Sequence, residues 1–161
     1  MYQTGGILFL VFLFFNIKFF LFNILGPFWT PNTAILLIVF FDLISGIRYS
    51  LATAVLCGIL EDSFSTGLFG INIFAYIASA YVTNIVKKYI YHRGSQLSRC
   101  FLVFVVLAFY LAIQTLLMLM YETIQFWDVV SFVIFPEIFT TLLITTFTFN
   151  QLRRCASRYL G

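Results

Sequence analysis

The chain has 161 residues, of which 62% are apolar, 20% aromatic and only 9% charged. Soluble domains carry about a quarter charged residues, so this composition excludes an ordinary soluble protein and indicates a membrane protein. The formal net charge of +3 comes from nine Lys or Arg and six Asp or Glu residues. The length fits one compact unit, and no stretch is polar enough for a second, so we expect a single transmembrane domain, 1–161.

Six apolar segments are candidates for membrane-spanning helices, which need about 20 apolar residues each. They cover residues 7–25, 31–47, 49–63, 70–88, 100–121 and 128–149. The first has no basic n-region and no small-residue cleavage site, so we interpret it as a retained helix and not as a signal peptide. The sequence therefore predicts an all-α integral membrane protein, a bundle of six transmembrane helices.

Basic residues occupy alternate connections between these helices. Arg48 lies in the second connection. The cations of the fourth connection and the C-terminal tail are Lys87, Lys88, Arg93, Arg99, Arg153, Arg154 and Arg158. Because Lys and Arg are retained on the cytoplasmic side, we expect a multi-pass protein with both termini cytoplasmic and a basic cytoplasmic face. Topology alone explains this face, while binding of anionic lipid or of an acidic partner stays open.

Small and polar residues share one face on three of the predicted helices. These faces are Ser50, Ala54, Gly58 and Asp62 on the third helix, Ala75, Ser79 and Thr83 on the fourth, and Glu137, Thr141, Thr145 and Thr148 on the sixth. Small residues let helix backbones approach closely in lipid. We therefore expect the three faces to meet inside the bundle, with Phe and Leu side chains directed towards lipid.

Three ionisable residues fall deep inside predicted helices. Lys18, Asp42 and Glu137 lie nine to eleven residues from their helix starts, which at about 1.5 Å per residue is roughly 14–17 Å. An isolated charge at that depth costs about 2.5–3.5 kcal/mol or more, so a partner is expected. We predict one intramembrane ion cluster of these residues, serving helix packing and not proton transfer. The alternative is that Lys18 extends alone towards the headgroups while one acid is protonated.

The stretch ILEDSFSTGLFGIN, residues 59–72, places two carboxylates, Glu61 and Asp62, at the end of an apolar run. A helix from Arg48 to Asp62 rises only about 21 Å, which is less than the hydrocarbon core. The loop that follows is therefore expected below the outer surface, where irregular backbone must be shielded by protein or by a watery cavity. Adjacent helical residues point about 100° apart, so Glu61 should face away from Asp62.

We expect the Asp62 carboxylate to hold this loop by accepting hydrogen bonds from backbone N–H groups of residues 63–70 and from the start of the next helix. Contact with a partner or ligand, and acid–base chemistry, are the alternatives. Gly67 and Gly70 permit positive φ angles in the loop. The predicted structural loop and partner-docking residues are Gly58, Glu61, Asp62, Gly67, Gly70 and Asn72.

The sequence holds no pattern typical of an active site or metal centre. His92 is the only histidine, and it is predicted on the side opposite Glu61 and Asp62, so no histidine–carboxylate pair can assemble. The cysteines, which lack the close pairing of zinc and redox motifs, are Cys57, Cys100 and Cys155. We therefore expect no enzyme activity, no cofactor or metal, and no nucleic-acid partner.

The region from Gly58 to Gly70 has the spacing G-x3-D-x7-G and is followed by INIFAYIASAYV. Together with Pro31 and Asn32 opening the second helix, and Pro136 in a last helix that ends in a basic pair, this resembles the MreD family of bacterial rod shape-determining membrane proteins. The resemblance is strong over about 40 residues and extends to size and hydropathy over the rest.

The resemblance implies a non-catalytic scaffold of the cell-elongation machinery in the bacterial inner membrane. It implies a fold similar to the substrate-binding subunits of energy-coupling-factor transporters. The implied principal partner is MreC, through its membrane helix and the adjacent segment, with links to MreB filaments, RodA and a class B penicillin-binding protein. We expect this contact on the outer half of the lipid-facing ridge around the third and fourth helices.

A vitamin-binding subunit of an energy-coupling-factor transporter is the alternative function, because it would share the fold. Such a subunit should present an outer cavity lined with polar groups, whereas the outer connections here are short and mostly aromatic. Copurification of a stoichiometric small molecule would favour transport.

Overall fold

The computed structural model describes residues 2–26, 29–65, 69–90, 96–121 and 136–146. The helices are α1 (Tyr2–Leu25), α2 (Thr33–Ser45), α3 (Ile47–Phe64), α4 (Ile71–Ile90) and α5 (Gln96–Tyr121). A further helical segment, 136–146, belongs to the sixth predicted helix. The ends of α1 to α5 lie within five residues of the predicted ends. Because the described residues contain no strand, the predicted all-helical class is confirmed.

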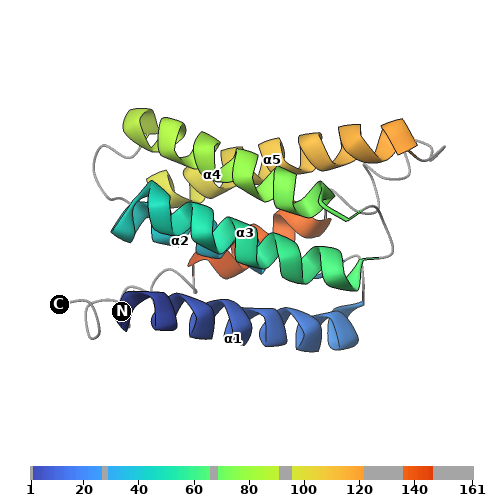
Figure 1. Ribbon diagram of the computed structural model, residues 1–161. Coiled ribbons are helices and arrows are strands. Elements are labelled where there is room, and N and C mark those ends of the chain that lie inside the picture. Colours follow the sequence, from blue (N-terminus) through green and yellow to red (C-terminus); the bar gives the residue numbers. More distant parts are fainter. Residues whose placement is uncertain (1, 27–28, 66–68, 91–95, 122–135, 147–161) are drawn as a thin grey trace.

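The chain passes up and down through a bundle. α1, α3 and α5 run in one direction, and α4 runs in the other (Figure 1). α2 leads into α3 through a single residue, Gly46, so these two helices are neighbours in the bundle. As a result Arg48 and Lys88 lie towards one end of the bundle, and Glu61 and Asp62 lie towards the opposite end.

α2 is the central helix of the bundle. It contacts α1, α3, α4 and α5, and every residue from 33 to 42 is buried. Asn32 caps its N-terminus, where the side-chain oxygen accepts a hydrogen bond of 3.2 Å from the backbone N–H of Ile35. A helix surrounded on all sides is apolar all round, which explains the uniform run from Ala34 to Phe41.

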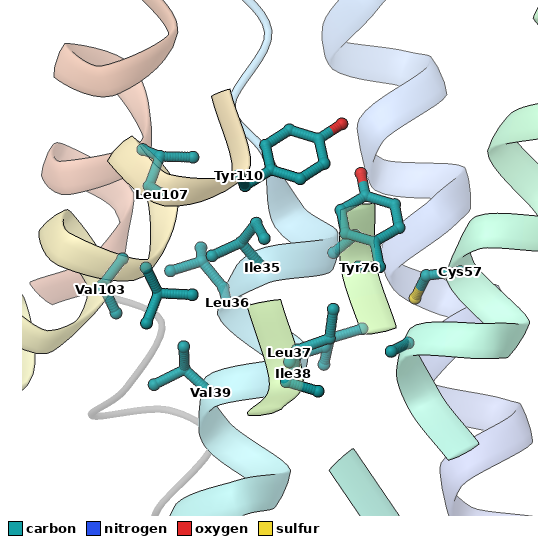
Figure 2. Close-up of a cluster of buried hydrophobic side chains, with 14 of the residues drawn as sticks. Ile35, Leu36, Leu37, Ile38, Val39, Cys57, Tyr76, Val103, Leu107 and Tyr110 are labelled. Carbon is teal, nitrogen blue, oxygen red and sulfur yellow. The ribbon is translucent and has the colours of Figure 1, made fainter. Parts of the chain in front are cut away.

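The apolar core forms around α2 (Figure 2). Its largest fully buried side chains include those of Ile35 and Leu36 on α2, Leu107 on α5, and the two tyrosines Tyr76 and Tyr110. Many phenylalanine side chains are instead exposed on outer faces, as predicted for side chains that contact lipid. They include Phe12, Phe20, Phe74, Phe101 and Phe139.

Length and apolar composition mark one described helix as able to cross a membrane, over Leu97–Leu117 in α5. Phe9–Ile24 and Thr33–Ser45 are shorter apolar helices. Polar residues lower the hydropathy of α3 and α4, and those predicted on one face of each helix are buried. They are Ser50 and Asp62 on α3 and Ser79 and Thr83 on α4.

Candidate functional site

Asp62 joins the end of α3 to the start of α4. Its buried carboxylate accepts backbone hydrogen bonds from Gly70 at 2.9 Å and from Asn72 and Ile73 at 3.2 Å each. The first N–H groups of a helix have no partner within the helix, and the helix dipole favours an anion there. Gly70 has a φ of +107°, which only glycine adopts without strain. The expected role of Asp62 in holding the loop is therefore seen in the structure.

Gly58 lies one helical turn before Asp62, at a position where the backbones of α3 and α4 are in contact. A Cβ atom at Gly58 would lie 2.5 Å from the Cα and 2.9 Å from the backbone nitrogen of Ile73. No side chain fits between these backbones. The stripe of Ser50, Ala54, Gly58 and Asp62 is buried along its whole length. Its Gly58 and Asp62 contact α4, while the Ser50 hydroxyl donates to the Ile38 carbonyl of α2. The predicted small-residue packing of these two helices is confirmed.

Glu61 faces a different side of α3 and connects it to two other helices. Its Oε1 accepts a hydrogen bond from Lys18 Nζ of α1, and the two side chains form an ion pair. Its Oε2 accepts a hydrogen bond of 2.6 Å from the hydroxyl of Tyr76 on α4. The side chains of Lys18 and Glu61 keep 26% and 14% exposure, so the pair lies at the edge of the bundle and not in its centre.

Two tyrosines extend this group of polar side chains across the bundle. The rings of Tyr76 and Tyr110 stack with centroids 4.8 Å apart and an interplanar angle of 4° (Figure 2). The Tyr110 hydroxyl donates to Asn72 Oδ1 at 3.3 Å. The Tyr76 hydroxyl has one proton to donate. It donates this proton in a hydrogen bond to Glu61 at 2.6 Å, because Asn32 Oδ1 is farther away at 3.4 Å.

Asn32 connects the start of α2 to the segment 136–146. Its side-chain N–H donates to Glu137 Oε1 at 3.0 Å, and its backbone N–H donates to the hydroxyl of Thr141 at 2.9 Å. Glu137 is half-buried, while Thr141 and Thr145 are buried. Thr148 of the same predicted face lies outside the described residues. This face therefore meets the N-terminus of α2, whereas Gly58 and Asp62 of the α3 face contact the start of α4. That all three faces meet at one place stays a prediction.

These contacts form three hydrogen-bonded groups, which the stacked rings of Tyr76 and Tyr110 and the 3.4 Å approach of the Tyr76 hydroxyl to Asn32 Oδ1 bring together. They join α1, α2, α3, α4, α5 and the segment 136–146, and we call them the outer polar network after the side of the membrane predicted for Glu61 and Asp62. The members of the network are Lys18, Asn32, Glu61, Asp62, Asn72, Tyr76, Tyr110, Glu137 and Thr141. Tyr76 lies five residues after the start of α4, and Tyr110 lies eleven before the end of α5. At about 1.5 Å per residue, both are roughly 7–16 Å from those helix ends. The network therefore lies within the helical bundle.

The predicted ion cluster of Lys18, Asp42 and Glu137 is wrong in its pairing. Lys18 pairs with Glu61, and Asp42 lies near the opposite end of the bundle. The prediction placed residues by depth alone, but α2 has only 13 residues and Asp42 is three before its end. Glu137 is close enough to Lys18 for electrostatic attraction, although it makes its hydrogen bond with Asn32.

Asp42 forms a second ion pair, with Lys87 of α4. The Lys87 nitrogen lies 3.0 Å from Asp42 Oδ2 and donates its directed hydrogen bond to the main-chain oxygen of Asp42, at 2.7 Å. That oxygen lies in the last turn of α2, where a cation is favoured by the helix dipole. The Asp42 side chain is fully buried, and its oxygens accept no directed hydrogen bond from the described residues.

Among the described residues, two cations of the predicted basic face are not exposed. Lys87 is half-buried against Asp42, and Arg99 is buried. Lys88 is exposed at the end of α4, and Arg48 is exposed at the start of α3. The remaining predicted members of the face, Arg93, Arg153, Arg154 and Arg158, lie outside the described residues, as do Gly67 and His92.

Sequence reasoning missed Asn32, Tyr76 and Tyr110 as members of the network. Tyr76 follows Asn72 by four residues and precedes Ser79 by three, so it continues the polar face of α4. That spacing was a usable signal. The sequence around Tyr110 is apolar, so it does not indicate whether this tyrosine is buried in the bundle or lies at the membrane interface.

Every hydrogen bond of the network named above that joins two elements also holds those elements together. No group of three or more potential metal ligands exists among the described residues. A cavity between α1, α2 and α3 is bordered by Lys18, Cys57 and Glu61, and it has room for about one water molecule.

Among the described residues, an all-helical bundle with one apolar helix long enough to span a membrane, ion pairs between helices and many exposed aromatic side chains is typical of a helical membrane protein. The family model described as rod shape-determining protein MreD matches residues 3–152. The chain therefore belongs to the MreD family, a family of membrane proteins that determine rod shape, as its resemblance indicated. Comparisons with curated proteins and with solved structures found no match.

Proposed function

We propose that the protein is a non-catalytic scaffold of the bacterial cell-elongation machinery, which binds MreC and is linked to MreB, RodA and a class B penicillin-binding protein. Membership of a rod shape-determining family supports the role in shape. The observation that supports a scaffold is the outer polar network, because its polar groups form hydrogen bonds between helices. In this proposal the protein is multi-pass in the inner membrane, with both termini cytoplasmic.

The proposed docking surface for the membrane helix of MreC is the outer half of α3 and α4. Ile59 and Phe64 of α3 and Phe74 of α4 are exposed there, at 41%, 70% and 60%. The backbone contact at Gly58 and the hydrogen bonds of Asp62 fix these two helices relative to each other. A rigid pair of helices offers a preorganised surface, which reduces the entropy cost of docking.

Photocrosslinking in native membranes tests the proposal. A crosslinking amino acid at Ile59 or Phe74 should yield adducts with MreC, identified by mass spectrometry. The same amino acid at Phe104, which is exposed on α5, serves as the matched control. Adducts with MreC that form only from α1 and α5 would contradict the proposed surface, and a rod-shaped strain lacking this protein would contradict the proposed role.

The transport alternative stays a prediction, and no observation on the described residues favours it. The small cavity beside Lys18 and Glu61 does not accommodate a vitamin. The similarity to energy-coupling-factor subunits is likewise a prediction, since no solved structure matches the chain.

A further inference from the structure

α1 has two opposite faces with different roles. One face carries Val11, Phe14 and Lys18, which are buried or half-buried against the bundle. The opposite face is exposed, with Phe9, Phe12 and Phe19 at 66%, 65% and 59%. Within the described residues α1 packs on α2 and α3 from one side only. Among the described residues, nothing covers its outer face.

The exposed face of α1 follows a heptad pattern. Positions 9, 16 and 23 are seven residues apart, and positions 12 and 19 follow the first two by three. These are the a and d spacings of a two-helix seam. The residues are Phe9, Phe12, Asn16, Phe19 and Asn23, all exposed. Two asparagines at a positions are unexpected on a surface that only contacts lipid.

Each asparagine side chain has hydrogen-bonding capacity that α1 itself does not use. One N–H of Asn16 donates to the Phe12 carbonyl at 2.8 Å, and one N–H of Asn23 donates to the Phe19 carbonyl at 3.2 Å. The structure gives these side chains no further hydrogen bond among the described residues. A second N–H and an acceptor oxygen remain on each, and an unmet polar group in hydrocarbon is costly.

We propose that this face of α1 binds the same face of a second copy of the protein, in a parallel homodimer. In a parallel pair each a position meets its own counterpart, so Asn16 meets Asn16 and Asn23 meets Asn23. An asparagine is both donor and acceptor, and it is therefore complementary to itself. Copies inserted in one orientation can only pair in parallel, which a twofold axis along the membrane normal satisfies.

The charge of α1 is also compatible with a second copy. The only charged residue between Tyr2 and Leu25 is Lys18, and it lies on the bundle side, paired with Glu61. The seam is therefore neutral, and two copies meet without repulsion between like charges. The proposed MreC surface on α3 and α4 is separate, so this inference stands independently of that one.

Disulfide crosslinking of the full chain in native membranes tests the dimer. The native cysteines are first replaced by alanine. Phe12→Cys and Phe19→Cys should then form disulfide-linked dimers on mild oxidation, because d positions face each other. Ile17→Cys on α1 and Phe101→Cys on α5 are also exposed, yet they should give about fivefold less dimer. Equal yields at all four positions, or adducts with another protein in place of dimers, would overturn the proposal.

Removal of the asparagines provides a second measurement. Asn16→Leu with Asn23→Leu should weaken dimerisation of the purified protein in liposomes by about tenfold, measured by energy transfer between labelled copies. Leucine suits a lipid-facing helix, so a folded monomer is expected. Asn16→Gln with Asn23→Gln keeps donors and acceptors and should retain most dimer. Unchanged association of the leucine variant would show that the asparagines do not hold a dimer.

Discussion

At the scale of single residues, Gly58 determines how closely α3 and α4 approach. Alanine in a helix is favoured over glycine by about 1 kcal/mol, whereas overpacking that moves backbone costs about 1–3 kcal/mol or more. A Cβ atom 2.5 Å from the Cα of Ile73 requires such movement, so the cost of overpacking exceeds the gain. Gly58→Ala should therefore lower the Tm of the purified protein in detergent.

Two further variants separate this effect from a general response to added volume. Val55→Ile adds one carbon to the exposed side of α3 and should leave the Tm unchanged. Ile73→Ala should fail to restore the Tm of Gly58→Ala, because the atoms in the way include the Ile73 backbone. A Gly58→Ala protein that melts at the wild-type temperature would show that the helices have room to separate.

Asp62 is the second residue on which this contact depends. Asp62→Ala leaves the N–H groups of Gly70, Asn72 and Ile73 without their acceptor, at a cost of about 1–3 kcal/mol in unfolding free energy. Asp62→Asn keeps one acceptor oxygen and should lose less. Ser63→Ala is a suitable control, because Ser63 is exposed and its hydroxyl bonds only to Ile59. Equal melting of the two alanine variants would contradict the role of Asp62.

At the scale of elements, α1 depends on the Lys18–Glu61 pair for its position. Lys18→Glu would place two carboxylates together at membrane depth, which costs several kcal/mol, and α1 should separate from α3. A crosslink by a short bis-maleimide between cysteines placed at Phe15 and Phe64, whose ring centroids are 5.2 Å apart, reports this contact. Its yield should fall in Lys18→Glu and recover when Glu61→Lys is added.

The matched control for that exchange is Lys18→Glu combined with Glu137→Lys. Lys18 makes its hydrogen bond with Glu61, while Glu137 makes its own with Asn32. Exchange with Glu137 should therefore restore less of the crosslink than exchange with Glu61. Equal recovery in the two double variants would show that attraction within the cluster is unspecific.

Hydropathy and polar spacing predicted the helices and the α3–α4 contact, but not the packing order. Proline and loop residues mark helix ends, and the small stripe through Gly58 and Asp62 can be placed on a helix directly from the sequence. The central position of α2 could not be predicted, because lipid and protein core are equally apolar. The prediction of the partner of Lys18 failed for a related reason. The depth of a residue along its own helix does not indicate which other helix lies beside that residue.

At the scale of the whole molecule, the two ends of the bundle differ in their polar groups. The outer polar network joins helices near the end that carries Glu61 and Asp62, while the Asp42–Lys87 pair joins α2 to α4 near the other end. An ion pair near each end, with an apolar core between, favours a rigid bundle. The partners could not be derived from this arrangement, because lipid-facing surfaces of different function share the same composition.

The same asymmetry predicts the orientation of the bundle in the membrane. Exposed cations at Arg48 and Lys88 lie at the end where α1 begins, and Lys and Arg are retained in the cytoplasm. Single cysteines at these two positions should react with a membrane-impermeant maleimide only after lysis of spheroplasts. A cysteine at Trp29, exposed between α1 and α2, should react in intact spheroplasts. Labelling of Arg48→Cys before lysis would reverse the orientation, and would place the outer polar network and the proposed MreC surface on the cytoplasmic side.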